Sequence, residues 1–231
     1  MSCKSEYTFI APWKVGIDSV RANRLPMVIL WLAAASVVFA YYASPGFAGL
    51  LEPLSRWQKE SGWVAAFLNR VVFCGALPGF FMVTVPALRP KNIVAAITVQ
   101  TLWSGICGIV SDLMFSANAA MFGTGIDFMT LTVKTSVNQF VWTPLFFSPL
   151  GSLVYFWIGH DFSLEDVRRS LSRRFYHDLV LPNLIVNWAL WIPATYAIHM
   201  FPTPLQIQLA GLASALLSLV MLAIGRRRSD R

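Results

Sequence analysis

Charged residues are scarce in this 231-residue sequence, and acidic residues are the scarcer kind. Asp, Glu, Lys and Arg together make up 13% of the chain, roughly half of the share in a typical soluble domain. Hydrophobic residues reach 56% and aromatic residues 14%. A soluble domain cannot bury so much apolar surface, and the same composition excludes a disordered chain. The composition therefore predicts an integral membrane protein.

Cysteine is also scarce. The chain has three cysteines, Cys3, Cys74 and Cys107, and none of them forms a CxxC pair. An odd number without this spacing indicates neither a disulfide framework nor a cysteine metal site. Cys74 and Cys107 fall inside apolar runs, where a free cysteine behaves as a small buried hydrophobic residue.

Signatures of catalysis are missing as well. The sequence has no GxSxG, HExxH or P-loop motif, so we expect neither an enzyme nor a bound cofactor. His160-Asp161 and His177-Asp178 are the remaining candidates for a metal site. A continuous helix between the two pairs would be ~25 Å long, which is too long for them to share an ion. No metal is therefore expected, and a membrane-embedded enzyme that uses His160 or His177 is the least favoured alternative.

Long apolar runs predict six membrane-spanning helices, because each run is long enough to cross a bilayer. They cover residues 25–45, 63–88, 92–118, 127–158, 179–201 and 205–225. The predicted fold is an all-α membrane domain over residues 25–225, between an N-terminal segment 1–24 and a basic tail 226–231. The fourth run exceeds the length that a bilayer requires, so we expect it to tilt, to break at Pro144 or Pro149, or to begin as an interfacial segment.

Basic residues are unevenly distributed between the two sides of a six-span arrangement. Arg56 and Lys59 fall on one side, and Arg70 and Lys134 fall within spans. The other fourteen share the side of both termini: Lys4, Lys14, Arg21, Arg24, Arg89, Lys91, Arg168, Arg169, Arg173, Arg174, Arg226, Arg227, Arg228 and Arg231. Because basic loops stay in the cytoplasm, both termini are predicted to be cytoplasmic. The net charge of +7 then reflects topology and contact with anionic lipid, and not nucleic-acid binding.

The N-terminal segment bears on the host membrane. Glu6 and Asp18 interrupt it, whereas transit peptides are poor in acidic residues. A bacterial inner membrane is therefore favoured, with the mitochondrial inner membrane or the peroxisomal membrane as alternatives.

The loop at 161–178 has the pattern of an amphipathic helix that lies on the membrane surface. Ser163 and Asp166 have the spacing of a capping box. Its apolar positions recur at intervals of three and four residues: Leu164, Val167, Leu171 and Phe175. Its basic positions are Arg168, Arg169, Arg173 and Arg174. This combination is typical of an interfacial helix in contact with anionic headgroups.

Polar residues inside the spans are the candidates for function, because they are costly in lipid and usually face the interior of a bundle. The ionisable ones are Arg70, Asp112 and Lys134. The others are Asn138, Gln139, Asn183, Asn187 and His199, with Gln206 and Gln208 beside the last turn. In one interpretation Arg70 and Lys134 extend to the headgroups or pair with Asp112. In the other, these residues line a polar cavity.

Small residues indicate close helix packing. Gly75 and Gly79 form a GxxxG motif, and Ser104 and Gly108 form a similar pair. Such motifs allow helices to approach closely, within one chain or between copies. A homo-oligomer therefore remains open.

Two spaced motifs resemble the 22-kDa peroxisomal membrane protein family, which includes the mitochondrial protein Mpv-17. The first is KTSVNQFVWTP, with Lys134, Asn138, Gln139 and Pro144. The second, after a basic loop, contains Asn187, Trp188, Trp191 and Pro193. The resemblance covers about 125–225 and implies a multi-pass protein that forms weakly selective channels for small solutes. In this chain Asn138 replaces the family's aspartate, and Pro193 lies one place late.

These observations lead to two main hypotheses. The first is a channel or transporter-like pore lined by Lys134, Asn138, Gln139 and Asn187, with Arg70 and Asp112 at its mouth and with helices broken at Pro144 and Pro193. The second is a membrane scaffold that does not transport and that binds lipid or a partner through the basic helix at 163–175.

Overall fold

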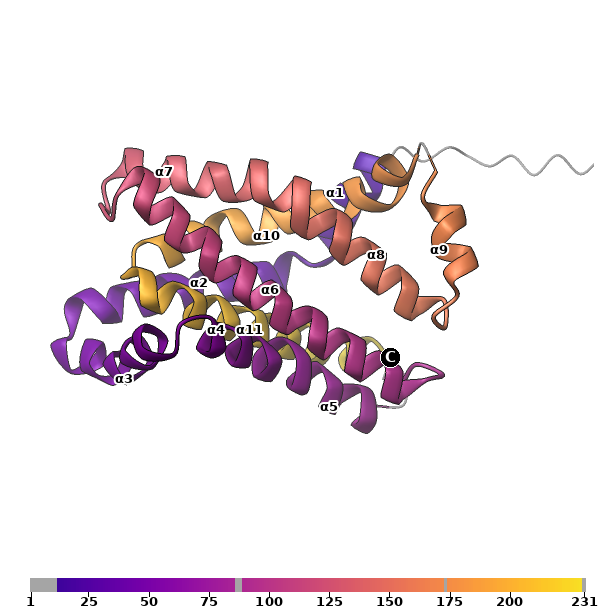
Figure 1. The fold of residues 1–231 in the computed structure, drawn as a ribbon, viewed down its shortest axis with the longest axis horizontal. Helices are drawn as coiled ribbons and strands as arrows, with labels where there is room; N and C mark the ends of the chain where they lie inside the picture. The colour runs from indigo at the N-terminus through magenta and orange to yellow at the C-terminus, as the bar shows by residue number, and fades with distance from the viewer. Residues whose placement is uncertain (1–11, 86–88, 173, 230–231) are drawn as a thin grey trace, which may run out of the picture.

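The computed structural model describes residues 12–85, 89–172 and 174–229, and side chains from residue 13 to residue 217 within these ranges. All regular structure in this part of the chain is helical. The elements are α1 (Pro12–Ala22), α2 (Arg24–Ala43), α3 (Pro45–Ser61), α4 (Trp63–Arg70), η1 (Val71–Ala76), α5 (Leu77–Thr84), α6 (Ile93–Phe122), α7 (Phe128–Val137), η3 (Asn138–Phe147), α8 (Ser148–Gly159), α9 (Leu164–Ser170), η4 (Tyr176–Val180), α10 (Leu181–His199) and α11 (Thr203–Ser229). Figure 1 shows helices arranged along one long axis, with α3 at one end of the bundle and α9 at the other.

Within the described residues, five helical stretches are long and apolar enough to cross a membrane. They are Arg24–Ala43, Trp63–Thr84, Ile93–Phe122, Phe128–Gly159 and Tyr176–His199. They coincide with the first five predicted runs. The sixth predicted run coincides with α11, in which Thr203–Leu217 is a shorter apolar helix. The all-helical class and five of the spans therefore agree with the sequence, and the sixth crossing stays a prediction.

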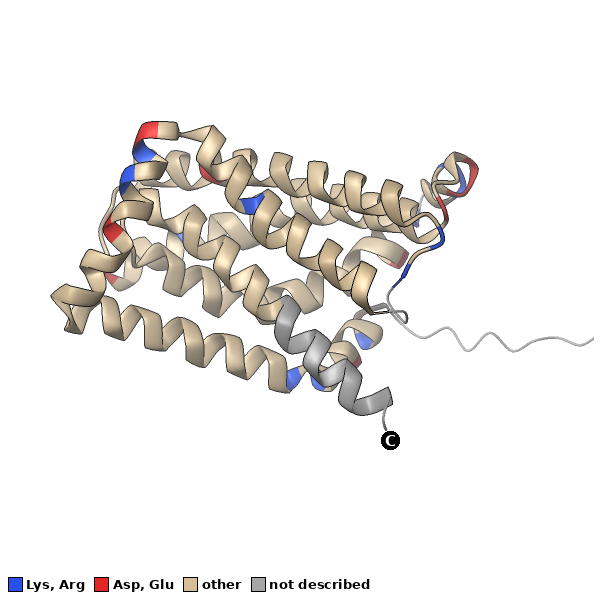
Figure 2. Cartoon of the chain, turned by 90° about the horizontal axis from the view of Figure 1, so that it is seen from below, with Lys and Arg blue, Asp and Glu red and all other residues tan. Residues whose placement is uncertain are grey.

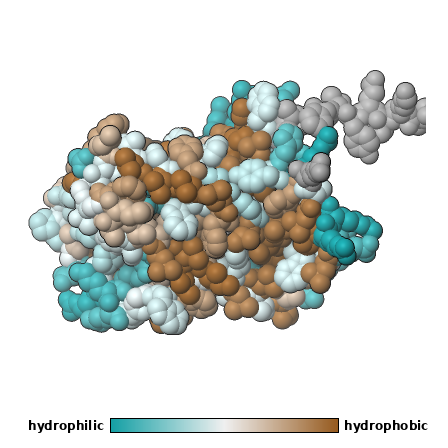
Figure 3. Space-filling view, turned by 45° about the horizontal axis from the view of Figure 1, so that its top comes forward, coloured by the Kyte–Doolittle hydropathy of each residue, from teal (hydrophilic) through white to brown (hydrophobic). Residues whose placement is uncertain are grey.

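The surface of the bundle is apolar along its length and polar at its ends. Figure 2 shows that charged residues gather at the two ends, and Figure 3 shows a broad hydrophobic region between hydrophilic ends. Large side chains such as Phe39 and Leu145 are 74% and 76% exposed. Exposed apolar surface of this extent marks contact with lipid or with another protein.

Proline does not break these helices, contrary to the expectation from sequence. Pro144 lies inside η3, a segment of π-helix, and the stretch Phe128–Gly159 is continuous through it. Pro193 lies inside α10, which is also continuous. A π-helix is wider than an α-helix and bonds each N–H to the carbonyl five residues earlier. The wider turn accommodates the ring at Pro144, so the backbone bulges where a break was expected.

The helix that the sequence predicts over 161–178 is shorter in the structure. Ser163 does cap it, since its Oγ accepts a hydrogen bond from the Asp166 N–H at 3.2 Å. The helix, α9, then ends after Ser170, and the residues from Tyr176 onward belong to the fifth apolar stretch. Arg173 lies outside the described residues. Asp161, which lies just before α9, accepts a hydrogen bond from Lys91 Nζ at 2.6 Å. This hydrogen bond raises the pKa of Lys91.

Glycines bring α6 into close contact with α4 and η1. A Cβ atom at Gly108 would lie 2.4 Å from the Ala66 carbonyl oxygen, and one at Gly105 would lie 2.3 Å from the Phe67 ring. On η1, a Cβ atom at Gly75 would lie 2.9 Å from Thr101 Cα. Both small-residue motifs are therefore used inside the chain, where only glycine permits this separation.

Substituting Gly108 with alanine is expected to destabilise the protein by about 1–3 kcal/mol, because the new methyl group meets backbone that cannot move without separating two helices. Gly151→Ala is the control, since nothing lies within 4 Å of a Cβ atom at that helical position. Thermal unfolding of both variants in detergent, followed by tryptophan fluorescence, measures the difference. Equal melting temperatures for the two variants would contradict this packing.

Candidate functional site

A cavity of about 430 Å³ lies between the helices. Four of the predicted site residues, Arg70, Asn138, Gln139 and Asn187, line it together with Trp191. Its further polar lining comes from residues that the sequence did not single out for a site: Gln100, Ser111, Thr143, Thr195 and Ser214. Arg70 is the only Lys, Arg, Asp or Glu side chain in the described lining. The cavity therefore combines amides and hydroxyls with one cation.

Asp112 and Asn183, also predicted, lie elsewhere. Asp112 Oδ1 accepts a hydrogen bond from Gln58 Nε2 at 3.0 Å, so its partner is an amide and not Arg70 or Lys134 as one interpretation expected. Asn183 Nδ2 donates to the Leu179 carbonyl at 3.0 Å, within its own helical stretch. Neither side chain lines the cavity.

Gln58 belongs to a chain of buried amides, of which the sequence singled out only Gln208. Gln208 Nε2 donates to Gln58 Oε1 at 2.8 Å, and Asn69 Nδ2 donates to Gln208 Oε1 at 2.7 Å. These residues come from α3, α11 and α4. Gln58 lies on a short amphipathic helix outside every predicted span, so no intramembrane position drew attention to it. Such amide bonds stabilise helix packing.

The π-helical turn η3 exposes a carbonyl that a side chain satisfies. In a π-helix the N–H of residue 144 would donate to the carbonyl of Gln139, but proline has no N–H. Trp188 supplies the missing donor, because its Nε1 lies 2.6 Å from the Gln139 carbonyl oxygen. Two residues of the motifs that resemble the family therefore meet at one backbone oxygen. Pro144 leaves the Gln139 carbonyl without a backbone donor, and Trp188 supplies the donor.

The same turn directs Gln139 towards α10. Its Nε2 donates to Thr195 Oγ1 at 2.9 Å, and its Oε1 accepts from Asn187 Nδ2 at 3.4 Å. Gln139 is buried. These bonds satisfy both ends of a polar group that would otherwise cost free energy in an apolar interior, and they form one wall of the cavity.

Asn118, Asn138 and His199 form a second buried group, named here the Asn–His layer. Asn118 Nδ2 donates to Asn138 Oδ1 at 2.6 Å, and Asn138 Nδ2 lies 3.1 Å from His199 Nε2. Since the amide nitrogen can only donate, this imidazole nitrogen accepts and the ring proton is on Nδ1. The Phe115 ring packs edge-on against His199, with centroids 5.5 Å apart.

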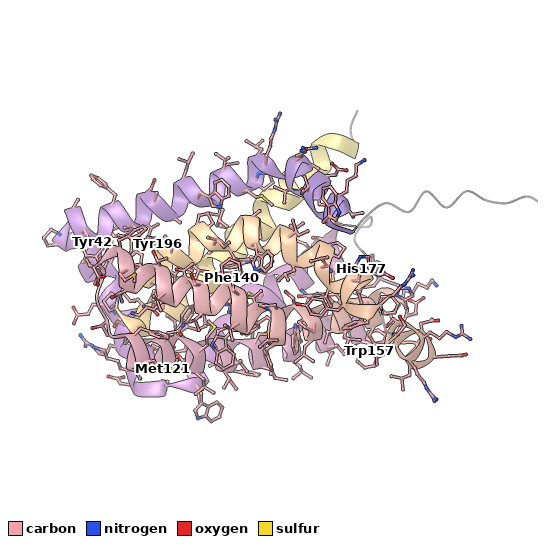
Figure 4. The ribbon with its side chains drawn as sticks, turned by 90° about the horizontal axis from the view of Figure 1, so that it is seen from above. Tyr42, Met121, Phe140, Trp157, His177 and Tyr196 are labelled. Carbon is pink, nitrogen blue, oxygen red and sulfur yellow. The ribbon has the colours of Figure 1, made fainter. Side chains whose placement is uncertain are left out.

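A second cavity of about 410 Å³, named here the vestibule, lies on the other side of the Asn–His layer. Lys134 lines it, one helical turn from Asn138, together with Tyr42 and Met200. Figure 4 shows Tyr42 at the end of the bundle opposite to His177. In α10 the lining passes from Ile198 in the first cavity to Met200 in the vestibule, with His199 between them. The layer therefore separates the two cavities.

Arg70 is held in the first cavity by weak partners. Its guanidinium donates to Ser214 Oγ at 3.0 Å and lies 3.5 Å from Cys74 Sγ. Its Nε atom is buried without a hydrogen-bond partner among the described residues. Arginine carries five N–H donors and stays charged. This side chain therefore retains donors for a solute in the cavity.

The histidine–aspartate pairs flank α9, as their sequence positions require. His177 Nδ1 lies 2.7 Å from Asp178 Oδ1, while Asp161 pairs with Lys91. Within the described part of the chain, no three His, Cys, Asp or Glu residues lie close enough together to hold a metal ion.

Comparison with models of known protein families gives no match, and comparisons with curated proteins and with solved structures give none either. The resemblance of residues 125–225 to the Mpv-17 family therefore depends on its motif residues alone.

Replacing Trp188 with phenylalanine removes the donor to the Gln139 carbonyl and is expected to cost about 1–3 kcal/mol, the usual penalty for a buried unsatisfied acceptor. In a Pro144→Ala background the new N–H can serve that carbonyl, so the same substitution should cost less. Thermal unfolding of the two single variants and the double variant gives this coupling. Trp63→Phe at an exposed position is the control. Strict additivity of the two substitutions would contradict the assignment.

Proposed function

We propose that the protein is a six-span membrane protein that moves small polar solutes through the bundle. The observation that supports this most directly is the pair of cavities on either side of the Asn–His layer. Membrane proteins tolerate buried polar side chains mainly where they serve a pathway or tie helices together. Here they surround space that a solute could occupy.

The two cavities together extend over most of the bundle. The first begins at Asn138 and Ile198 and continues past Ser104 to Pro78 and Leu217, which lie further towards the His177 end. The vestibule occupies the Tyr42 end. Between them lie the hydrogen bonds of the Asn–His layer and the Phe115 ring that packs against His199, and these side chains have to rearrange for the path to open. This state is a closed one with its larger cavity towards the His177 end.

The solute path predicts measurable flux. Phospholipid vesicles that contain the purified protein should release small ions, anions among them, faster than empty vesicles do. Asn138→Ala and His199→Ala should increase this release severalfold, because each removes one member of the Asn–His layer. Asn183→Ala is the control, since this amide lies outside both cavities. Flux no higher than that of empty vesicles for the wild type and both layer variants would overturn the proposal.

The charge distribution supports an orientation with both termini on the cytoplasmic side. Lys91, Arg168 and Arg174 lie in connections at the His177 end, whereas Arg56 and Lys59 lie in α3 at the other end. Basic residues are retained in the cytoplasm, which places the Tyr42 end outside. A bacterial inner membrane remains the favoured host.

Single cysteines report this orientation. In a Cys3→Ser, Cys74→Ser, Cys107→Ser background, Glu60→Cys should react with an impermeant maleimide on intact cells, whereas Glu165→Cys should react only after lysis. Labelling by mass shift on a gel measures both. The reverse pattern would overturn the orientation, and labelling of both positions on intact cells would overturn the six-span count.

Exposed apolar residues at α9 favour a second candidate function, a lipid- or partner-binding scaffold. Leu164 and Leu171 are 71% and 54% exposed, beside Arg168. Arg169 is partly neutralised, because its guanidinium lies 2.5 Å from a Glu165 oxygen. A dry interior that excludes water-soluble thiol reagents from Cys107 would favour this function over transport.

A further inference from the structure

Lys134 is the most deeply buried charged side chain among the described residues, with 1% of its surface exposed. It forms no salt bridge with any described carboxylate. An ammonium group in this position is costly unless a partner compensates it. Lys134 lines the vestibule, so a partner can reach it there.

The first turn of α11 contributes a second source of positive potential. Thr203 and Pro204, its first two residues, line the vestibule with Lys134. No acidic residue lies in this turn. The N-terminus of a long helix carries a partial positive charge and favours anions. Two separate elements, α7 and α11, therefore direct positive charge into the same space.

Asp127 is the carboxylate that interacts electrostatically with Lys134, and it is already engaged elsewhere. It caps α7, where its Oδ1 accepts the Thr130 N–H at 3.0 Å. This hydrogen bond holds the pKa of the Asp127 carboxyl below its usual value. Asp127 does not line the vestibule. The Asp127 carboxylate therefore weakens the positive potential around Lys134 but does not occupy the space in front of its ammonium group.

We propose that the vestibule binds a small oxyanion, a carboxylate or a phosphate, between Lys134 Nζ and the first turn of α11. Its volume of about 410 Å³ is within the range of sites for small molecules. The oxyanion belongs either to a free solute or to a lipid headgroup at the membrane surface. The role of this site as an entry point rests on the proposed function, whereas the binding itself does not.

The lining of the first cavity also suits a small anion. Arg70 is the only Lys, Arg, Asp or Glu side chain in its described lining, and none of these residue types other than Lys134 lines the vestibule. An anion that passes the Asn–His layer would therefore meet a second cation, and a cation would meet none of the carboxylates that usually attract it. The solute class that this path selects is the small anion.

Binding is tested with inorganic phosphate on protein in discs of zwitterionic phosphatidylcholine. Phosphate should raise the melting temperature of the wild type by several degrees at saturation, because a ligand stabilises the state that binds it. Lys134→Arg should keep this shift and Lys134→Met should abolish it. Lys59→Met, which removes an exposed cation at the same end, is the matched control and should respond as the wild type does.

A second arm replaces phosphatidylcholine with phosphatidylglycerol. Stabilisation by this lipid that Lys134→Met abolishes, together with loss of the phosphate response, identifies the headgroup as the ligand. Equal phosphate shifts in wild type and Lys134→Met, or no Lys134-dependent shift in either arm, would overturn the site. Binding without vesicle flux would remove the proposed transport and leave the site, whereas flux without binding would do the reverse.

Discussion

The hydrogen bond from the Trp188 indole to the Gln139 carbonyl is the contact on which the polar interior depends. Pro144 leaves this carbonyl without a backbone donor, and the wider turn that accommodates the proline also sets where neighbouring side chains point. Because the indole replaces the missing N–H, the π-helical turn keeps all its groups satisfied in an apolar surrounding. Asn138 then contacts His199, and Gln139 contacts Thr195 and Asn187.

The polar groups of the bundle fall into sets with different physical roles. The amides of Gln58, Gln208 and Asn69 are hydrogen-bonded to one another, and Gln58 also bonds to Asp112, as expected for groups that tie helices together. Arg70 and Lys134 are the opposite case, since each borders a cavity and neither forms a salt bridge with a described carboxylate. A buried cation that forms no salt bridge does not stabilise a fold, and the proposed function therefore depends on these two residues.

The sequence was a good guide to the helices and to half of the site. Apolar run length predicted the five long stretches, and polar residues within them identified Arg70, Asn138, Gln139 and Asn187. Partners were harder to predict, because they depend on the rotation of each helix. For this reason the role of Asn118 was not predicted and Asp112 was assigned the wrong partner, whereas Gln58 was missed because it lies outside every predicted span. The predicted breaks at Pro144 and Pro193 were wrong. The π-helix η3 accommodates the Pro144 ring, and α10 continues past Pro193.

The glycine contacts between α4, η1 and α6 have a mechanical consequence. Backbone lies against backbone there, at Gly108 and Gly75, so the second and third apolar stretches form one stiff body. Beside the first cavity, α6 meets η3 through the amides of Asn118 and Asn138, which are side-chain contacts. The bundle therefore has one helix interface made by backbone contacts and one made by side-chain amides. The proposed solute path implies that any movement that joins the two cavities occurs at the second interface, with the paired helices held fixed.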